Sequence, residues 1–393
     1  MLKKYNQRRL IRSLQAFVSL FFLSSQIFGQ AKGVDAFASY ELNKDQRSIK
    51  LPDIIDEVEF IRLEETAESL ISDVGDVHLV GDKFVFVGDR FKGDIFVFSS
   101  NGRLIKRINR KGSSPEEYLS LKSMWMDGDI IVVSTSQNDI KRYRLNGDFV
   151  SSRKLDLAAG HVISNAGNYF LDMNFNIADN QSRYKVLKLN GDMQVVGKYL
   201  PFSKELGASA GMMTAYSSLF KYRESIAFHR PLSDTVYLYQ NNEIRRLVHF
   251  EYGDNWLWDD YDALSANKMQ GLRSGVKVWS FSPKIGPRYI LTSARYGGRK
   301  NLWFHHIIDR KNSETVLIDL SRSSKKGVFN LDVKDWESDS VFYAVVSSMD
   351  AVGLVTEATS KNWTFRGSTS LEEIASSENP VLVRIRIKDF SKE

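Results

Sequence analysis

Four hairpin sequences recur along the chain at a nearly constant spacing. Each consists of an alternating apolar strand, a turn that begins with asparagine, and a second alternating strand. Successive turns are 45, 44 and 51 residues apart, and their asparagines are Asn101, Asn146, Asn190 and Asn241. An Asn-Gly or Asn-Asn pair suits the positive φ of a tight hairpin turn. The chain is therefore an array of similar β units.

A further strand pair precedes each hairpin, and its second members are expected at 83–89, 129–136, 168–176 and 225–232. Four antiparallel strands in each repeat are typical of a propeller blade, because one small twisted sheet buries both faces only against copies of itself. Two further units follow: 288–320 supplies three strands of a fifth blade, and 340–348 with 379–387 supplies part of a sixth. The sequence predicts an all-β fold, a six-bladed β-propeller with four-stranded antiparallel blades, with seven blades as the less favoured count.

The alternating segment 57–65 precedes the first blade and is left over once the blades are counted. An unpaired blade edge would expose backbone donors and acceptors. We therefore expect this segment to be the outer strand of the C-terminal blade, so that an N-terminal strand closes the ring. The propeller then spans residues 55–390, after a lead segment at 32–54.

Two insertions widen the repeat spacing. Residues 254–275 have acids near the start, helix formers within and a glycine at the end, which predicts a helix or helical turn between blades four and five. Residues 349–378 form a Ser/Thr-rich insertion inside blade six. Excursions of this length from a compact scaffold are often functional loops, and a helical cap on one face of the ring is the alternative.

Residues 1–31 predict a secretory signal peptide. They contain five Lys or Arg, no acid, an apolar run at 14–28 and small residues at the end. A retained signal anchor is the alternative, but the run is short and interrupted. Cleavage after Ala31 lowers the formal charge from +6 to +6 − 5 = +1, which removes the main argument for nucleic-acid binding. With no later transmembrane span, we expect an extracytoplasmic protein, either periplasmic or secreted.

The sequence contains none of the familiar catalytic, nucleotide-binding or metal-binding motifs. The chain has no cysteine, which excludes disulfides, thiolate nucleophiles, Cys-ligated zinc and a lipid-acceptor cysteine. The six histidines form no HExxH pair, and no G-x-S-x-G elbow, P-loop or G-x-G-x-x-G occurs. We therefore predict no catalytic residue, no metal site and no cofactor. Calcium in the channel is the one alternative, held by side chains such as Asp89, Asn138 and Asn174.

Two segments carry a family resemblance. RKGSSPEEY at 110–118 is similar to a basic–Gly–x–Gly–Pro–x–Glu–Tyr element, and ENPVLVRIRIKDF at 378–390 resembles the C-terminal strand of the same family. With hairpins that resemble NHL-type repeats, residues 55–390 resemble the six-bladed β-propeller family of bacterial envelope proteins, many of which are labelled as domains of unknown function. Ser114 stands where that family usually has a second glycine. The resemblance implies the fold and the compartment rather than an activity.

A ligand site is expected on one face of the ring. In a propeller, the loops from strand two to strand three and from each blade to the next meet on that face, which we call the top face. Its polar and aromatic side chains suit hydroxyl-rich or acidic ligands. The predicted binding residues are Arg90, Glu117, Tyr118, Asn138, His229 and Arg295. The alternative is that these residues form turns or brace neighbouring blades, with Glu117 bonded to the backbone and Tyr118 packed between blades.

Two classes of function follow. The favoured one is a recognition or scaffolding module that binds a glycan, a peptide or an envelope protein on the top face. The alternative is a propeller enzyme, a lyase or hydrolase of carbohydrates or lactones, assisted by calcium. A purely structural envelope component is a third hypothesis. The sequence does not fix the oligomeric state.

Overall fold

The computed structural model describes residues 36–174, 183–202, 217–258, 277–297, 302–322, 327–357 and 362–390. The chain divides into two units after Phe37, and the fold below belongs to the unit that starts at Ala38. The predicted signal peptide lies outside the described residues. Among the helices that are described, none has the length and apolar character needed to cross a bilayer.

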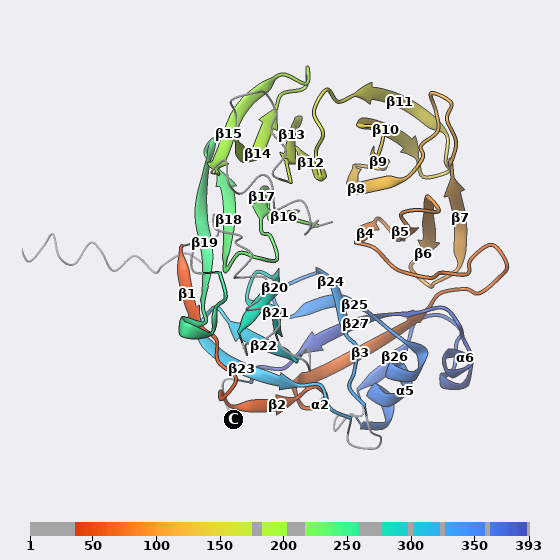
Figure 1. Ribbon diagram of the computed structural model, residues 1–393. Helices are drawn as coiled ribbons and strands as arrows, with labels where there is room; N and C mark the ends of the chain where they lie inside the picture. The colour runs from red at the N-terminus through yellow and green to blue at the C-terminus, as the bar shows by residue number, and fades with distance from the viewer. Residues whose placement is uncertain are drawn as a thin grey trace, which may run out of the picture. The chain divides into compact units, whose positions relative to one another are not determined.

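Six antiparallel sheets follow one another around a ring (Figure 1). Blade one contains β4 (Val77–Val80), β5 (Lys83–Asp89), β6 (Asp94–Ser99) and β7 (Leu104–Asn109). Blade two contains β8 (Leu121–Asp127), β9 (Ile130–Thr135), β10 (Asp139–Arg144) and β11 (Phe149–Lys154). Blade three contains β12 (His161–Asn165), β13 (Asn168–Asp172), β14 (Tyr184–Leu189) and β15 (Val195–Pro201).

The second half of the ring has the same plan with extra strands. Blade four contains β16 (Leu219–Tyr222), β17 (Ser225–Phe228), β18 (Thr235–Gln240) and β19 (Glu243–Glu251). Blade five contains β20 (Val278–Ile285), β21 (Tyr289–Tyr296), β22 (Trp303–Asp309) and β23 (Glu314–Asp319). Blade six contains β24 (Asp332–Trp336), β25 (Val341–Val346), β27 (Val381–Ile387) and β3 (Ile55–Arg62). The prediction of a six-bladed propeller is confirmed.

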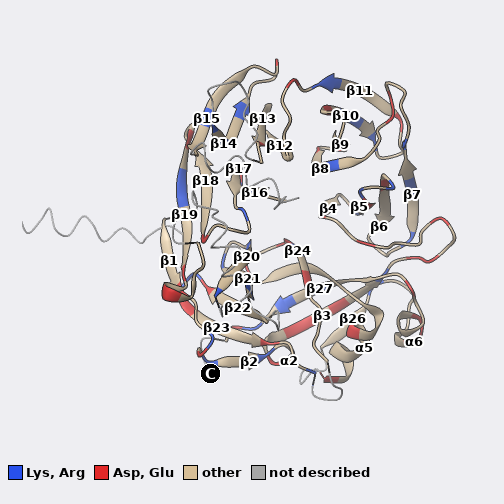
Figure 2. Ribbon diagram, in the orientation of Figure 1, with Lys and Arg blue, Asp and Glu red and all other residues tan. Residues whose placement is uncertain are grey.

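The first strand of each blade lies nearest the ring axis and the fourth lies near the rim (Figure 1). Apolar residues fill both faces of the middle strands, as in β6, where Asp94 through Phe98 are all buried. Outer strands such as β11 are largely exposed. Acidic and basic residues are interspersed along the strands of the blades (Figure 2). The core therefore lies between neighbouring blades.

The ring is closed by an N-terminal strand, as predicted. β3 pairs antiparallel with β27, with Val58 opposite Ile385. A fifth strand that the sequence did not predict, β26 (Trp363–Phe365), runs parallel along the outer side of β3. Because β3 pairs with strands on both sides, it is not the outermost strand of its sheet.

The lead segment also has structure. β1 (Ala38–Glu41) adds a parallel fifth strand to blade four, and β2 (Ser48–Lys50) adds one to blade five. A short helix, α2 (Leu51–Ile54), then leads into β3. The N-terminal segment thus binds three successive blades together. These strands escaped sequence prediction because three or four residues give too few alternations to recognise.

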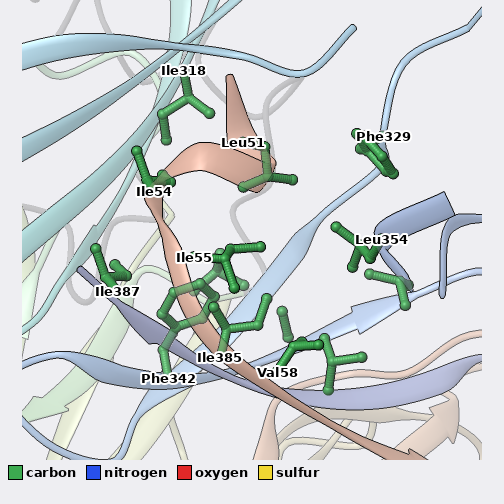
Figure 3. Close-up of a cluster of buried hydrophobic side chains, with 14 of the residues drawn as sticks. Leu51, Ile54, Ile55, Val58, Ile318, Phe329, Phe342, Leu354, Ile385 and Ile387 are labelled. Atoms are coloured by element: carbon green, nitrogen blue, oxygen red, sulfur yellow. The ribbon is translucent and has the colours of Figure 1, made fainter. Parts of the chain in front are cut away.

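A hydrophobic cluster surrounds the closure (Figure 3). Leu51 and Ile54 from α2 pack with Ile318 of blade five and with Phe342 and Ile385 of blade six, and all are buried. Each such side chain contributes roughly 1.5–3 kcal/mol by leaving water. The N-terminal segment is therefore held by packing as well as by strand pairing.

The second insertion contributes to this cluster. It contains most of α5 (Ser348–Glu357), β26 and α6 (Leu371–Ala375), which a capping box of Ser370 and Glu373 starts. Leu354 and Ile374 are buried in the closure cluster. The first insertion falls mostly outside the described residues, which show only a 3-10 turn, η2 (Gly253–Asn255), and two buried tryptophans after it.

The hairpin turns use positive φ as predicted in three of the four repeats, at Gly102, Gly147 and the pair Asn241 and Asn242. In blade three the positive φ falls on Met193 instead of the Asn-Gly pair. Gly102 also lies against β3, because its carbonyl accepts a hydrogen bond from the Glu64 amide at 2.7 Å. A Cβ there would lie 1.9 Å from the Arg62 carbonyl oxygen.

We expect Gly102→Ala to lower the free energy of unfolding by more than the ~1 kcal/mol that a left-handed alanine costs, since it adds a backbone clash. Gly128→Ala is the matched control, because Gly128 has φ +61° and nothing within 4 Å of the added carbon. Urea unfolding of both variants measures the difference. Equal losses would show that the contact between Gly102 and Arg62 contributes nothing.

Candidate functional site

Two of the predicted residues, Arg90 and Asn138, meet at Lys122 between blades one and two. The Arg90 guanidinium donates a hydrogen bond to the Lys122 carbonyl oxygen. The Lys122 ammonium in turn donates to the Asn138 side-chain oxygen at 2.9 Å and to the Ala159 carbonyl at 3.0 Å. These side chains therefore join three consecutive blades.

Glu117 and Tyr118 lie in the connection between blades one and two. The Tyr118 hydroxyl donates to the Gly93 carbonyl at 2.8 Å, and burial of the side chain raises its pKa to about 12. Its ring meets Tyr143 of blade two edge-on. The Glu117 carboxylate accepts the Ser114 amide at 3.0 Å, and this contact lowers its pKa. Tyr118 is fully buried, so it presents no surface to a ligand.

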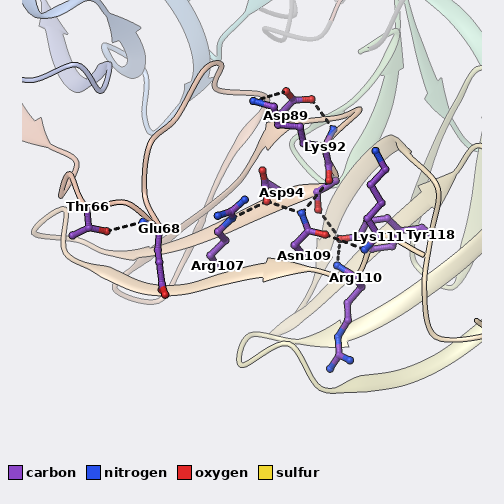
Figure 4. A network of polar contacts seen from close by, with 11 residues as sticks. Thr66, Glu68, Asp89, Lys92, Asp94, Arg107, Asn109, Arg110, Lys111 and Tyr118 are labelled. Carbon is purple, nitrogen blue, oxygen red and sulfur yellow. Dashed lines mark hydrogen bonds and ion pairs between the residues drawn. The ribbon is translucent and has the colours of Figure 1, made fainter. Parts of the chain in front are cut away.

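A polar network at the top of blade one has Tyr118 at one end (Figure 4). Buried Asp94 accepts hydrogen bonds from Arg107 at 2.8 Å and from Asn109 at 2.9 Å. Asp89 accepts the amides of Phe91 and Lys92 and so shapes the loop between β5 and β6. The acidic residues here hold strand ends and a turn.

His229 and Arg295 lie in blades four and five. His229 is buried, its Nε2 lies 2.8 Å from the Ser233 carbonyl oxygen, and burial lowers its pKa to about 4. The Arg295 guanidinium lies 4.6 Å from the Trp279 ring centre and 5.5 Å from that of Trp303. Four of the six predicted residues thus lie at blades one and two, and the other two lie in blades four and five.

The structure also reveals a charged group that the sequence did not predict, the axial cluster of Asp76, His78, His161, Lys284 and Asp335. It combines residues on or beside the first strands of blades one, three, five and six. Burial opposes ionisation of Asp76, but Lys284, the hydroxyl of Ser217 at 2.8 Å and the two histidines outweigh it and lower its pKa to about 2. Burial lowers the pKa of His161 to about 4.

The axial cluster is therefore a mixed site at neutral pH, with an ionised Asp76 and a neutral His161. His161 Nδ1 accepts the Leu219 amide at 3.1 Å, which fixes the ring. Within the ranges that the structure describes, no three His, Asp or Glu side chains are grouped so as to hold a metal ion. The sequence repeat does not indicate this cluster, because its members lie on or beside the short first strands of four separate blades.

A buried ion pair joins blades three and four. Arg230 Nη1 lies 3.1 Å from Asp172 Oδ1, and both side chains are almost inaccessible. Arg230 Nη2 also donates to the Asn174 side-chain oxygen at 2.5 Å, and the Ser218 hydroxyl donates to Asp172 at 2.6 Å. These contacts fix the Arg230 side chain at the top of blade four.

Beside this ion pair lies a pocket of about 150 Å³, which we call the basic pocket. Its cations and aromatic rings come from Lys185, Arg230, Arg246, Phe228, Tyr237, Trp256 and Trp258. Arg246 is exposed, while the two tryptophans are buried. None of the six predicted binding residues lines it. In the sequence, the two tryptophans at 256–258 are the feature that could have indicated this pocket. They lie in the insertion for which a helix was predicted, so the sequence did not assign them to a binding site.

The ring of six blades defines the protein as a six-bladed β-propeller. The chain belongs to the family described as a domain of unknown function, DUF4934, whose profile matches residues 37–386. No curated protein matches the sequence.

Two solved structures from Bacteroides match this chain in the structural comparison. A protein of Bacteroides fragilis, named as a candidate exported protein, is 15% identical with a TM-score of 0.69, over 90% of this chain and 100% of its own. A protein of unknown function from Bacteroides caccae is 11% identical with a TM-score of 0.35, over 62% of this chain and 81% of its own. At these identities the likeness to the first concerns the fold alone.

Proposed function

We propose that this protein is an exported recognition module that binds a glycan, a peptide or a protein partner on its top face, at the basic pocket. Export is supported by the basic and apolar pattern of residues 1–31 and by the name of the similar Bacteroides fragilis protein. The N-terminal pattern belongs to this chain itself and carries the greater weight.

The basic pocket is the observation that carries the binding role. Arg246 offers a planar fork of donors that matches carboxylates and vicinal hydroxyls, and Tyr237 offers a ring beside it. Arg230 also lines the pocket, and its side chain needs no reorganisation because Asp172, which pairs with its charge, and Asn174 already hold it. This chemistry suits an anionic or hydroxyl-rich ligand such as an acidic glycan.

Arg246→Gln should weaken binding of tetragalacturonate about tenfold or more, because a charge-assisted hydrogen bond is lost. Isothermal titration calorimetry with residues 32–393 measures this, with neutral cellotetraose and the blocked peptide acetyl-Gly-Glu-Gly-amide as further probes. Arg245→Gln is the matched control. The side chain of Arg245, which precedes Arg246 in β19, points to the other face of the strand and donates a hydrogen bond to Gln240.

Equal affinities in the two variants would contradict a site at the basic pocket. Binding of the acidic peptide instead of the sugar, with the same loss in Arg246→Gln, would identify a peptide or protein partner. Absence of binding by all three probes would contradict the proposed ligand chemistry.

A further inference from the structure

A second pocket, the acidic pocket, lies beside the basic pocket where β1 and β19 end. It has a volume of about 560 Å³ and shares Asp234 and Trp256 with the basic pocket. This volume falls in the range of small-molecule sites. Acidic residues stand out in red near the label of β1 in Figure 2. The carboxylates that line it belong to Glu41, Asp234, Glu251 and Asp254.

These four carboxylates have little positive charge nearby. Among the residues that the structure describes, no Lys or Arg lines the acidic pocket. Among the described residues, the ion-pair contacts of the four come only from His249, at 3.3 Å from Asp234 and 3.8 Å from Glu251. The Ser39 hydroxyl donates to Glu251 at 2.6 Å and so orients it. Like charges around one partly enclosed volume repel each other and favour a bound cation.

An independent feature of the same pocket is the hydroxyl of Tyr252. The side chain is 4% exposed, lines the pocket, and has no hydrogen-bond partner for its hydroxyl within the described part of the chain. Burial raises its pKa, and Tyr296 and Asp234 add to the effect. A buried hydroxyl without a partner is costly and is ready to accept a hydrogen from a ligand.

Aromatic rings complete the pocket. Tyr252 stacks on Trp256, with ring centres 5.5 Å apart and planes inclined by 14°. A cation is attracted to the face of such rings. Carboxylates, an unpartnered hydroxyl and aromatic rings together form a recognition set for an organic ammonium group, which combines positive charge, three N–H donors and an apolar stem.

We propose that the acidic pocket binds a primary ammonium group carried by a protein partner, the side chain of a lysine. Glu251 and Asp254 accept its hydrogens, Tyr252 accepts a third, and Trp256 contacts the adjoining carbon stem. This inference does not rest on the proposed function, because it concerns a different pocket and a ligand of opposite charge.

Isothermal titration calorimetry tests the proposal with two ammonium probes, acetyl-Gly-Lys-Gly-amide and chitotriose. N-acetylated chitotriose and the glutamate peptide serve as uncharged and anionic counterparts. We expect the double variant Glu251→Gln with Asp254→Asn to weaken ammonium binding about tenfold or more. Glu243→Gln is the matched control, since it removes one exposed carboxylate at the other end of β19, outside the pocket. Tyr252→Phe should weaken binding without lowering the unfolding temperature, because no protein hydrogen bond is lost.

Preference for the lysine peptide, with binding lost in the double variant and not in Glu243→Gln, supports the proposal. Preference for chitotriose would assign the pocket to a glycan and would overturn it. Binding that survives the double variant, or binding of neither ammonium probe at millimolar concentration, would overturn it. Calcium that binds more tightly than both probes and is lost in the double variant would assign the pocket to a metal and also overturn it. Arg246→Gln should leave ammonium binding intact, so the two proposals fail separately.

Discussion

Acidification from pH 7 to pH 5 should remove about 6 kcal/mol of the free energy of unfolding, or about 2 kcal/mol for each of three buried histidines. Burial lowers the pKa of His161, His229 and His306 to about 4 in the folded protein. The ordinary value near 6.5 applies to the unfolded chain. Between these values the unfolded chain binds more protons, so stability is complete above about 6.5 and is lost as the pH falls toward 4.

The loss is comparable with the whole stability of many domains, so the propeller should unfold in mild acid. Urea unfolding at pH 7, 6 and 5 measures the slope. His161→Gln and His306→Gln should each reduce the loss between pH 7 and pH 5 by about 2 kcal/mol, whatever their stability at pH 7. Glu117→Gln is the control, because hydrogen bonds from Ser114 lower the pKa of that carboxyl and place its titration below this window.

Buried carboxylates give a different dependence of stability on pH. The pKa of Asp76 lies at about 2, so its contribution is present above its ordinary value near 4 and is lost only in stronger acid. A stability curve that stays flat from pH 7 to pH 5 and falls only below pH 4 would contradict the role assigned to the buried histidines.

The repeat made the blade plan predictable. The spacing of the turn asparagines locates β6, β10, β14 and β18, and each hairpin partner follows from it. The closing strand at Ile55–Arg62 was also predictable, since one long alternating segment was left without a partner. By contrast, β1, β2 and β26 pair in parallel over three or four residues, and long-range contacts rather than local pattern decide such pairing.

The candidate sites were less predictable because sequence spacing does not show where loops converge. The binding residues were predicted from their expected position on the top face. Two of them, Tyr118 and His229, are buried in the structure, and their polar groups are hydrogen-bonded. The basic pocket depends on Arg246, a mid-strand residue, and on Trp256 and Trp258 after the end of blade four. The acidic pocket needs Glu41 beside Glu251, a pairing of positions 210 residues apart that only the parallel contact of β1 with β19 creates.

Closure of the ring should depend on β3 more than on any other N-terminal element. Phe60 is fully buried at its centre, pairs with Val383 of β27 and lies 5.8 Å from the ring of Phe365 in β26. Phe60→Ala should lower the free energy of unfolding by about 3–5 kcal/mol, since it leaves a cavity where the two chain ends meet. Phe91→Ala, at a side chain that is 74% exposed, is the matched control and should change it by less than about 0.5 kcal/mol.

Two truncated chains distinguish the contribution of β1 and β2 to stability from the closure of the ring by β3. A chain that starts at Leu51 lacks β1 and β2 but keeps β3. It should still fold, because at least four strands remain in every blade, but the loss of β1 and β2 should reduce its stability. A chain that starts at Leu63 leaves the edge of β27 unpaired along its whole length, so it should give no cooperative unfolding transition by circular dichroism. Cooperative unfolding of the second chain near the temperature of the first would show that the ring closes through blade-to-blade packing alone. The predicted contrast arises because β3 contributes hydrogen bonds to both neighbours, whereas β1 and β2 each cover one outer edge.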